Sequence, residues 1–77
     1  MNSSTLNKST NAVNIWTDDI KMHVVLEDGR ELNISIDWFP SLRDATQAQR
    51  DNWRFIGDGE GIHWEELDED IWIEGLL

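Results

Sequence analysis

The amino-acid sequence predicts a single small α+β domain. In it, a small antiparallel sheet, made of a three-stranded meander plus a short C-terminal strand, packs against one main helix. Apolar residues alternate with polar ones through the first half of the chain, as they do in strands with one buried face. A capping box opens a helical pattern in the middle. The 77 residues contain no cysteine, so one core has to stabilise the fold without disulfides.

The first eleven residues differ from the rest of the chain. They are rich in Ser, Thr and Asn and nearly devoid of apolar side chains, so they bury too little surface to offset their conformational entropy. We therefore expect residues 1–11 to form a disordered tail and residues 12–77 to form the domain. Because residues 1–11 contain no apolar run, they predict neither a signal peptide nor a membrane segment.

Three strands are predicted in the first half of the domain. Ala12 to Thr17 forms the first, residues 20–27 the second and residues 31–37 the third, with a turn at residues 17–19. The alternation places the following side chains on the inner face: Ile20, Met22, Val24, Leu26, Leu32, Ile34 and Ile36.

The hairpin between the second and third strands requires a loop of odd length. A two-residue loop at Asp28-Gly29 would place an inward Leu26 opposite an outward Glu31. A three-residue loop at residues 27–29, with Gly29 in the left-handed region, keeps the two inner faces together. This register predicts two pairs, Val24 with Leu32 and Met22 with Ile34.

A helix is predicted after Pro40, which cannot donate a hydrogen bond to a neighbouring strand. Thr46 and Gln49 have the spacing of a capping box, so the helix is expected to begin at residue 47 and to end at Ile56, before Gly57. Its apolar stripe should pack on the sheet and contains Trp53 and Ile56, whereas the side chains of Arg50 and Arg54 should point to solvent.

The last third of the chain has less regular patterning. Glycines at positions 57, 59 and 61 predict a flexible hinge. A phosphate-binding loop is disfavoured, because no long strand precedes the glycines and the acidic surroundings would repel a phosphate. Residues 62–64 are predicted as the short C-terminal strand, and residues 67–77 as a turn followed by an extended or irregular tail.

The charge of the chain is strongly negative and uneven. Sixteen Asp and Glu against six Lys and Arg give a net charge of −10, and residues 57–77 hold eight acidic residues without Lys or Arg. Binding to a nucleic-acid backbone or to an anionic membrane needs basic side chains, so both are disfavoured. The charge favours a basic protein partner, although it could equally serve only to keep a small protein soluble.

No combination of residues predicts catalysis, a metal or a cofactor. His23 with Ser35 and Asp37 would lie on an open sheet face without an evident oxyanion hole. His63 could act with Asp68 or Asp70, but a zinc site needs three or four ligands, and there is no Cys and only one other His. The spacing of Asp58 and Glu69 resembles a calcium loop but lacks the required intermediate residues.

Two binding surfaces are therefore the main candidates. The first is an acidic run with an aromatic centre: Glu65, Glu66, Asp68, Glu69, Asp70, Trp72 and Glu74. An aromatic side chain among carboxylates suits a basic partner, while Trp64, Leu67, Ile71 and Ile73 are expected in the core. The second is a patch on the outer sheet face: Trp16, His23 and Val25. The alternative for this patch is that the C-terminal segment covers it.

Several motifs resemble a known family. They are Gly61-Ile62-His63-Trp64, Leu67-Asp68-Glu69-Asp70 and Gly75-Leu76-Leu77, together with residues 45–57. From residue 13 to residue 77 the chain is similar to the bacterial family catalogued as domain of unknown function 2442. It departs from that family at Glu65, where Pro is usual, and at Trp72, where a small polar residue is usual.

The resemblance implies a compact sheet-plus-helix domain from a bacterium or a bacteriophage. Some relatives carry a helix-turn-helix after the domain, which is not expected here because the sequence ends at Leu77. Stand-alone relatives often neighbour a gene for a domain of unknown function 4160 protein, in the manner of toxin–antitoxin pairs. Such a protein is a candidate basic partner.

Two functions remain open. The first is a cytoplasmic, non-enzymatic, antitoxin-like domain that neutralises or scaffolds a basic protein. The second is a phage- or mobile-element-encoded inhibitor or nucleic-acid mimic, or a regulatory module without its own DNA-binding helix. The absence of cysteine suits a reducing cytoplasm.

Overall fold

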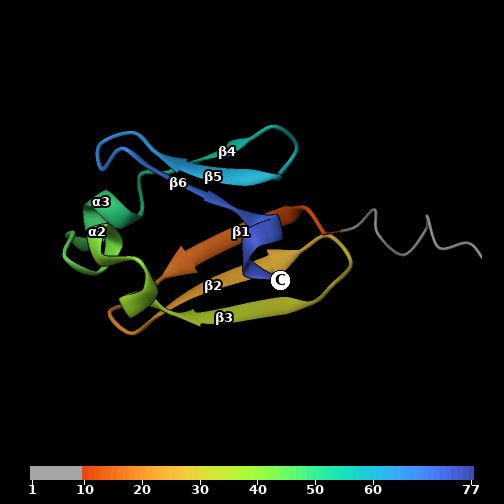
Figure 1. The fold of residues 1–77 in the computed structure, drawn as a ribbon, viewed down its shortest axis with the longest axis horizontal. Helices are drawn as coiled ribbons and strands as arrows, with labels where there is room; N and C mark the ends of the chain where they lie inside the picture. Colours follow the sequence, from red (N-terminus) through yellow and green to blue (C-terminus); the bar gives the residue numbers. More distant parts are fainter. Residues whose placement is uncertain (1–9) are drawn as a thin grey trace, which may run out of the picture.

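The computed structural model describes residues 10–77 and contains two three-stranded antiparallel sheets (Figure 1). The first sheet has the order β1-β2-β3, and the second has the order β4-β5-β6. The strands are β1 (Ala12–Thr17), β2 (Lys21–Leu26), β3 (Glu31–Ser35), β4 (Arg54–Ile56), β5 (Gly61–Trp64) and β6 (Glu69–Trp72). Four short helices connect or follow them: η1 (Ile36–Trp38), α2 (Pro40–Arg43), α3 (Gln47–Arg50) and η2 (Ile73–Leu76).

The predicted tail lies outside the described residues except for Thr10 and Asn11. The backbone of Asn11 belongs to the fold, because its carbonyl accepts a hydrogen bond of 2.8 Å from the N–H of Glu27. Both helices α2 and α3 lie at one end of the molecule, and residue 10 lies at the other end (Figure 1). None of the helices within residues 10–77 is long and apolar enough to cross a membrane.

The hairpin of β2 and β3 has the predicted register. Val24 pairs with Leu32 and Met22 pairs with Ile34. The loop has three residues, because the N–H of Leu26 donates to the carbonyl of Arg30 at 2.8 Å. Gly29 has a φ of 94°, in the left-handed region that glycine adopts without strain.

Ile20 was wrongly predicted to face the core. It is 70% exposed, because the second strand begins one residue later, at Lys21. The Asp18 carboxylate accepts hydrogen bonds from the N–H groups of Ile20 and Lys21, at 2.8 and 2.7 Å. These bonds place Ile20 in the turn between β1 and β2, a type of local structure that Asp stabilises.

The predicted main helix is also wrong. The capping box forms, with the N–H of Gln49 donating to Thr46 Oγ1 at 3.1 Å and the N–H of Thr46 donating to Gln49 Oε1 at 2.9 Å. However, α3 ends at Arg50, and residues 54–56 form β4 instead of helix. Pairing with β5 supplies the backbone hydrogen bonds and sets Phe55 opposite Ile62. This tertiary pairing outweighs helical periodicity in a segment rich in aromatic and β-branched residues.

Arg50 was predicted to be exposed, yet it is only 4% exposed. Because the helix ends there, its guanidinium reaches the place where α2, α3 and the β1–β2 turn meet. It donates to the carbonyls of Leu42 and Ala45, both at 3.2 Å, and to Asp19 Oδ1 at 2.7 Å. The carbonyl of Arg50 accepts a 3.0 Å hydrogen bond from the indole N–H of Trp64. Such bonds are what allow a charged side chain to be buried.

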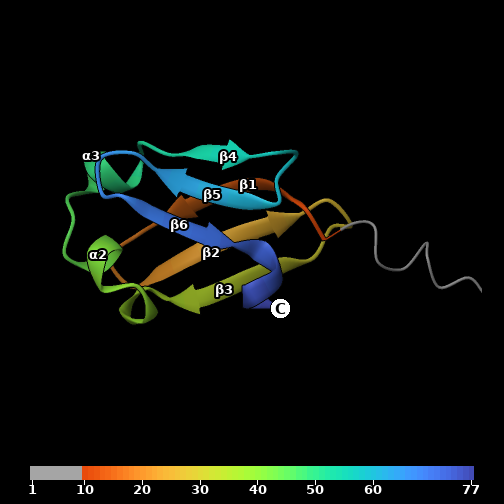
Figure 2. The same cartoon turned by 45° about the horizontal axis from the view of Figure 1, so that its top comes forward.

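The core lies between the two sheets, which overlap when the molecule is turned (Figure 2). Strands of both sheets and the connecting helices contribute to one cluster of buried side chains. Trp53 is only partly buried, and it packs on this cluster with its ring edge-on to Phe55 at a centroid distance of 4.8 Å. The fully buried members of the cluster with the largest side chains are Trp64, Met22, Leu26, Ile36, Leu42, Ile62, Ile73 and Val24.

The glycine-containing turn between β4 and β5 is packed against β1, so the prediction of a flexible hinge is wrong. Gly59 is buried with a φ of 101°, and its carbonyl accepts a 2.8 Å hydrogen bond from the N–H of Ala12. A Cβ at position 59 would collide with the Ala12 carbonyl oxygen. Only glycine fits so close an approach of two backbones.

The C-terminal segment is more regular than predicted. Residues 69–72 form β6, which pairs with β5, and η2 follows directly. The N–H of Ile73 donates to the carbonyl of Glu60 at 3.0 Å. The single predicted sheet with a short C-terminal strand is therefore replaced by two separate sheets.

Candidate protein-binding surface

The predicted acidic run is divided among several places in the second sheet and its connections. β5 is the central strand, with inward Ile62 and Trp64 and outward Gly61 and His63. Because side chains alternate along a strand, Asp70 and Trp72 of β6 share the outer face with His63 and Gly61.

His63 is the centre of one group on this outer face. It pairs with Arg54 of β4 and with Asp70 of β6. The Nδ1 atom of His63 lies 2.5 Å from Asp70 Oδ1, and Nε2 lies 2.9 Å from Glu65 Oε1. These hydrogen bonds, first that of Asp70 and then that of Glu65, raise the pKa of His63 above its ordinary value.

This group is poorly arranged to chelate a metal ion. The carboxylates of Asp70 and Glu65 lie on opposite ring nitrogens of His63, whereas a chelating set directs its lone pairs to one point. No cluster of three or more His, Cys, Asp or Glu that could hold a metal occurs within residues 10–77. Asp68, the other predicted neighbour of His63, has a φ of 52° in the turn between β5 and β6.

Glu66 and Glu69 face the helices. The side-chain amide of Gln49 in α3 donates to Glu66 Oε2 at 3.3 Å, and the hydroxyl of Ser41 in α2 donates to Glu69 Oε1 at 2.6 Å. These two carboxylates therefore connect the second sheet to the helical end of the molecule, and they contribute to packing as well as to charge.

Trp72 is the exposed aromatic side chain of this sheet, as the sequence predicted. It is 52% exposed and pairs with Gly61 across β5 and β6. A Cβ at position 61 would lie 2.7 Å from Cε3 of Trp72 and 3.3 Å from Cδ1 of Ile56. The indole ring therefore occupies the space above Gly61, beside Ile56, and the glycine makes this position possible.

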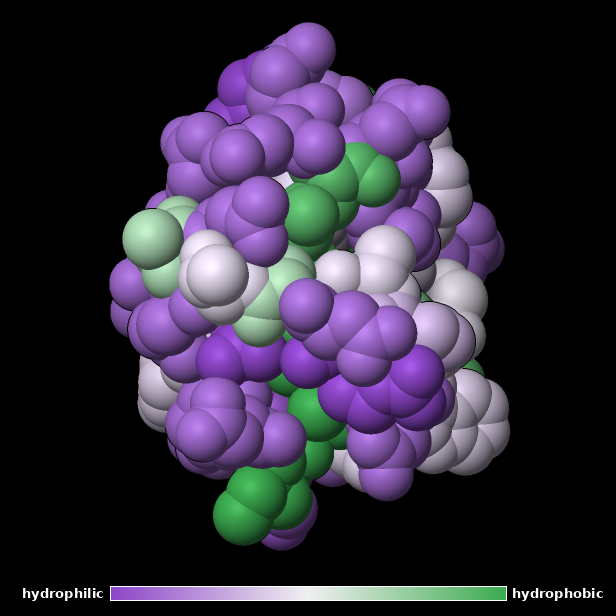
Figure 3. Space-filling view, turned by 90° about the vertical axis from the view of Figure 1, so that its left-hand side faces the viewer, coloured by the Kyte–Doolittle hydropathy of each residue, from purple (hydrophilic) through white to green (hydrophobic). Residues whose placement is uncertain are grey.

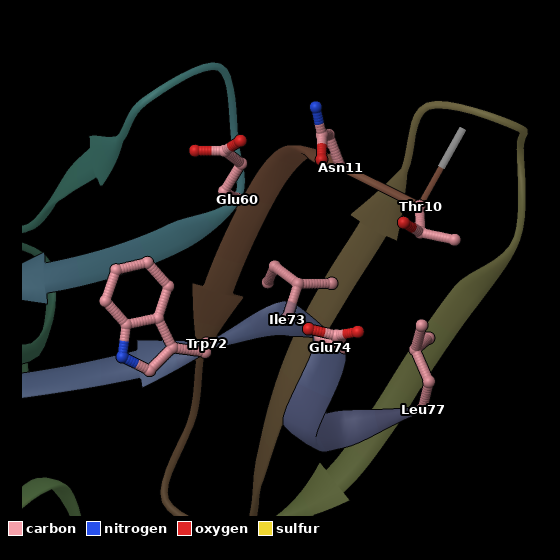
Figure 4. Close-up of a pocket in the computed structure, with 7 residues that line it drawn as sticks. All are labelled: Thr10, Asn11, Glu60, Trp72, Ile73, Glu74 and Leu77. Atoms are coloured by element: carbon pink, nitrogen blue, oxygen red, sulfur yellow. The ribbon is translucent and has the colours of Figure 1, made fainter. Parts of the chain in front are cut away.

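A groove extends from Trp72 to the beginning of β1 (Figure 4). Its volume is about 650 Å³, and it is lined by Thr10, Asn11, Glu60, Trp72, Ile73, Glu74 and Leu77. The sequence analysis identified Trp72 and Glu74 but missed Glu60 and Asn11. These two join the groove only because the β4–β5 turn packs against the beginning of β1, and no local pattern predicts that contact.

The second predicted surface forms on the outer face of the first sheet. Trp16 and His23 are neighbours in the β1–β2 pair, and their rings stack with centroids 4.9 Å apart and planes at 7°. Val25 is half-buried in the adjacent pair. The C-terminal segment does not cover this patch, because η2 lies on the side of the first sheet that faces the second (Figures 1 and 2).

Polar neighbours hold His23 in place. Its Nε2 lies 3.1 Å from Asp18 Oδ2 and its Nδ1 lies 2.7 Å from the side-chain amide of Asn33. The hydrogen bond that His23 donates to the Asp18 carboxylate is the main cause that raises the pKa of His23. Ser35 is opposite Lys21 in the sheet, whereas His23 is opposite Asn33. His23 and Ser35 are therefore not directly opposite each other across the two strands.

Asp18 is strongly biased to the charged form. The N–H groups of Lys21 and Ile20 donate to it, and these bonds, with that of His23, lower the pKa of Asp18 to about 2. Its role is to hold the turn, and the carboxylate is exposed.

The end of the molecule that carries the helices offers no broad apolar surface. Figure 3 shows this end as mostly hydrophilic, with small and separate hydrophobic areas. The groove beside Trp72 lies outside this end and combines apolar with acidic side chains in its lining.

Comparisons with known proteins identify a matching family and a solved structure with a similar fold. Residues 12–77 match the family described as "Protein of unknown function (DUF2442)". The chain is also similar to a protein of unknown function from Rhodospirillum rubrum ATCC 11170, whose crystal structure it matches with a TM-score of 0.76. The two sequences are 29% identical, over 91% of this chain and 86% of the other. Among curated proteins, none matches this sequence.

Proposed function

We propose that this chain, which belongs to the DUF2442 family of proteins of unknown function, is a non-enzymatic domain that binds a basic protein partner. The observation that carries the proposal is the position of Trp72. Its ring lies over Gly61 at the edge of a groove that is also lined by Glu60 and Glu74. Exposed Trp side chains next to a cavity are typical of residues that dominate binding energy.

Charge supports a basic partner over other classes. Residues 57–77 carry eight acidic side chains and no Lys or Arg, and they include two of the three strands of the second sheet, β5 and β6. Such a surface attracts a basic protein during diffusional encounter and repels nucleic acids. In this proposal the chain acts in the manner of an antitoxin and neutralises its partner. The partner is a small basic protein encoded beside the gene, for example a domain of unknown function 4160 protein. We place the interaction in the cytoplasm, which suits a chain without cysteine.

Stopped-flow binding to a purified basic protein encoded beside the gene tests the proposal. The association rate should fall as salt rises, because salt screens the attraction over a Debye length of about 8 Å at physiological ionic strength. Trp72→Ala should speed dissociation by about tenfold, since it removes the exposed ring. Ile20→Ala is the control, because Ile20 is 70% exposed in the turn between β1 and β2 and does not line the groove.

The choice of charge variants follows from the hydrogen bonds. Glu66 and Glu69 bond to Gln49 and Ser41, so their replacement would disturb packing as well as charge. Glu60→Gln with Glu74→Gln is the better double variant, and it should slow association without changing the fold. Absence of binding, or binding that ignores both salt and Trp72, would show that the proposal is wrong.

The alternative is an inhibitor that mimics a nucleic acid, which the same cluster of carboxylates favours. In that case the partner is a nucleic-acid-binding protein, and double-stranded DNA should compete with the chain for it. A partner that binds this chain equally well with and without DNA excludes the mimic.

A further inference from the structure

We propose that the groove beside Trp72 receives one arginine side chain of the protein partner, with its guanidinium against the Trp72 ring and near the carboxylates of Glu60 and Glu74. This inference rests on the proposed function and narrows it to one kind of side chain at one place.

The size of the groove fits a long side chain. Its volume of about 650 Å³ lies within the range of about 300–1,000 Å³ for pockets that bind small ligands. The groove can therefore hold an extended side chain and part of the main chain that carries it. Figure 4 shows Trp72 at one side of the groove, Thr10 and Asn11 at the other, and Glu74 between them.

The ring of Trp72 is placed in advance. The ring fills the space that a Cβ at position 61 would need, next to Ile56, and Trp72 is still 52% exposed. A cation over a Trp face is attracted by the ring quadrupole, and guanidinium is found there more often than ammonium. Little side-chain entropy remains to be lost at Trp72 when a ligand binds, which favours affinity.

The carboxylates of the groove are available for a cation. Within residues 10–77, neither Glu60 nor Glu74 forms an ion pair with a basic side chain of this chain. This differs from Glu65 and Asp70, which are engaged by His63. Two carboxylates that line the same groove as an aromatic ring match the two recognition modes of guanidinium, which pairs with carboxylates and stacks on rings.

Arginine fits this groove better than lysine. The guanidinium is planar and weakly hydrated, so it can lie on the indole and donate to a carboxylate at the same time. The ammonium of lysine is a compact and strongly hydrated charge, which gains less from an aromatic surface. The groove lining combines Trp72, Ile73 and Leu77 with polar side chains, which suits the apolar stem of arginine as well as its charged end.

An NMR titration of the full chain with acetyl-arginine N-methylamide tests this inference. The indole N–H of Trp72 and the backbone N–H groups of Glu60 and Glu74 should shift in a saturable way. The indole N–H of Trp64 serves as an internal control, because it is buried and donates to the Arg50 carbonyl. Acetyl-citrulline N-methylamide has nearly the same shape without the charge and should bind at least about threefold more weakly. Nα-acetyl-lysine N-methylamide, whose side chain keeps its charge, should bind with an affinity between those of the arginine and citrulline probes.

Two variants complete the test. Glu60→Gln with Glu74→Gln should weaken binding of the arginine probe by about two- to fivefold, whereas Asp37→Asn removes a charge in η1 that does not line the groove and should change nothing. Equal binding of the arginine and citrulline probes, or arginine binding that persists unchanged in the double variant, overturns the inference. Lysine binding as tight as arginine overturns the choice of arginine.

The probe and the partner report separately on the two proposals. If the basic protein binds in a Trp72-dependent way and the arginine probe does not, the function stands and the arginine assignment fails. If the probe binds in the groove and no basic protein binds the chain, the groove chemistry stands and the proposed function fails.

Discussion

At the scale of the residue, Arg50 has more structural connections than its place in the sequence suggests. Its guanidinium bonds to two carbonyls of the α2 region and to Asp19, while its carbonyl accepts from the Trp64 indole. A buried donor or acceptor left without a partner costs about 1–3 kcal/mol. Loss of this side chain leaves the carbonyls of Leu42 and Ala45 without this donor, whereas the Trp64 bond goes to the main-chain carbonyl and does not depend on the side chain.

Arg50→Ala should lower the free energy of unfolding by about 3 kcal/mol. Arg43→Ala is the control, because Arg43 is exposed and pairs with the neighbouring, exposed Asp44. Exposed pairs contribute about 0–1 kcal/mol. Urea denaturation followed by far-UV circular dichroism measures both variants, and a similar effect of the two would contradict the role of Arg50.

The pH dependence of stability should follow His63. Its pKa is raised by the hydrogen bonds of Asp70 and Glu65, so the folded state binds the proton more tightly than the unfolded state does. The resulting stabilisation is complete below the unfolded value of 6.5, and it disappears as the pH rises through the higher pKa of the folded state. His63→Gln should therefore lose more stability relative to the native sequence at pH 5.5 than at pH 8.5.

Urea denaturation at these two pH values provides the measurement. His23 contributes in the same direction, since Asp18 raises its pKa. The stability of the His63→Gln variant should therefore still depend on pH to some extent. The double variant with His23→Gln should remove most of that remainder. A stability difference between the native sequence and His63→Gln that is equal at both pH values would contradict the effect of the Asp70 and Glu65 hydrogen bonds.

At the scale of the element, local signals were predictable and distant ones were not. The β2–β3 hairpin follows from its alternation and from Gly29, both of which lie within the hairpin itself. The end of α3 was predicted wrongly because residues 54–56 form β4 by pairing with β5, and β5 lies beyond the next turn of the chain. The pattern within residues 47–56 does not show this pairing. The burial of Arg50 was missed for a related reason, since its acceptor Asp19 is 31 residues away.

The candidate site divides in the same way. The outward position of Trp16 with His23 could be read from strand alternation, and exposure of Trp72 from its acidic surroundings. Glu60 and Asn11 could not be identified, because the groove arises where the β4–β5 turn meets the first strand. Sequence periodicity describes one element at a time and does not encode which elements meet.

The β4–β5 turn itself can be tested by comparing two glycines. Gly59→Ala should destabilise the domain by about 2–3 kcal/mol, because the new Cβ would collide with the Ala12 carbonyl and φ is 101°. Gly75→Ala should change stability by less than about 0.5 kcal/mol, since nothing lies within 4 Å of a Cβ there. Thermal unfolding measures both, and equal midpoints would show that Gly59 is not held against β1.

At the scale of the whole molecule, the net charge of −10 acts on the folded state as well as on partners. Like charges repel one another more strongly in a compact molecule than in an extended chain. Raising the salt concentration screens this repulsion, because the Debye length falls from about 30 Å at 0.01 M to about 10 Å at 0.1 M.

The domain should therefore be more stable at 0.1 M than at 0.01 M sodium chloride, by on the order of 1 kcal/mol. The gain should be smaller in the Glu60→Gln and Glu74→Gln double variant, which carries two fewer negative charges. Thermal unfolding at the two salt concentrations checks both statements. Equal stability at both concentrations would indicate that local pairs, such as those of His63, offset the repulsion.

The order of the strands also has a kinetic consequence. Each strand pair of the two sheets joins strands that follow one another in the sequence, from β1 with β2 through to β5 with β6. Domains with such short-range pairings have low contact order and fold quickly for their size, because little loop-closure entropy has to be lost before contacts form. We therefore expect the two three-stranded sheets to form independently. Their docking, which includes the hydrogen bond from Ala12 to Gly59 and the pair of Arg50 with Asp19, is then expected to come late, so that loss of these contacts should mainly speed unfolding.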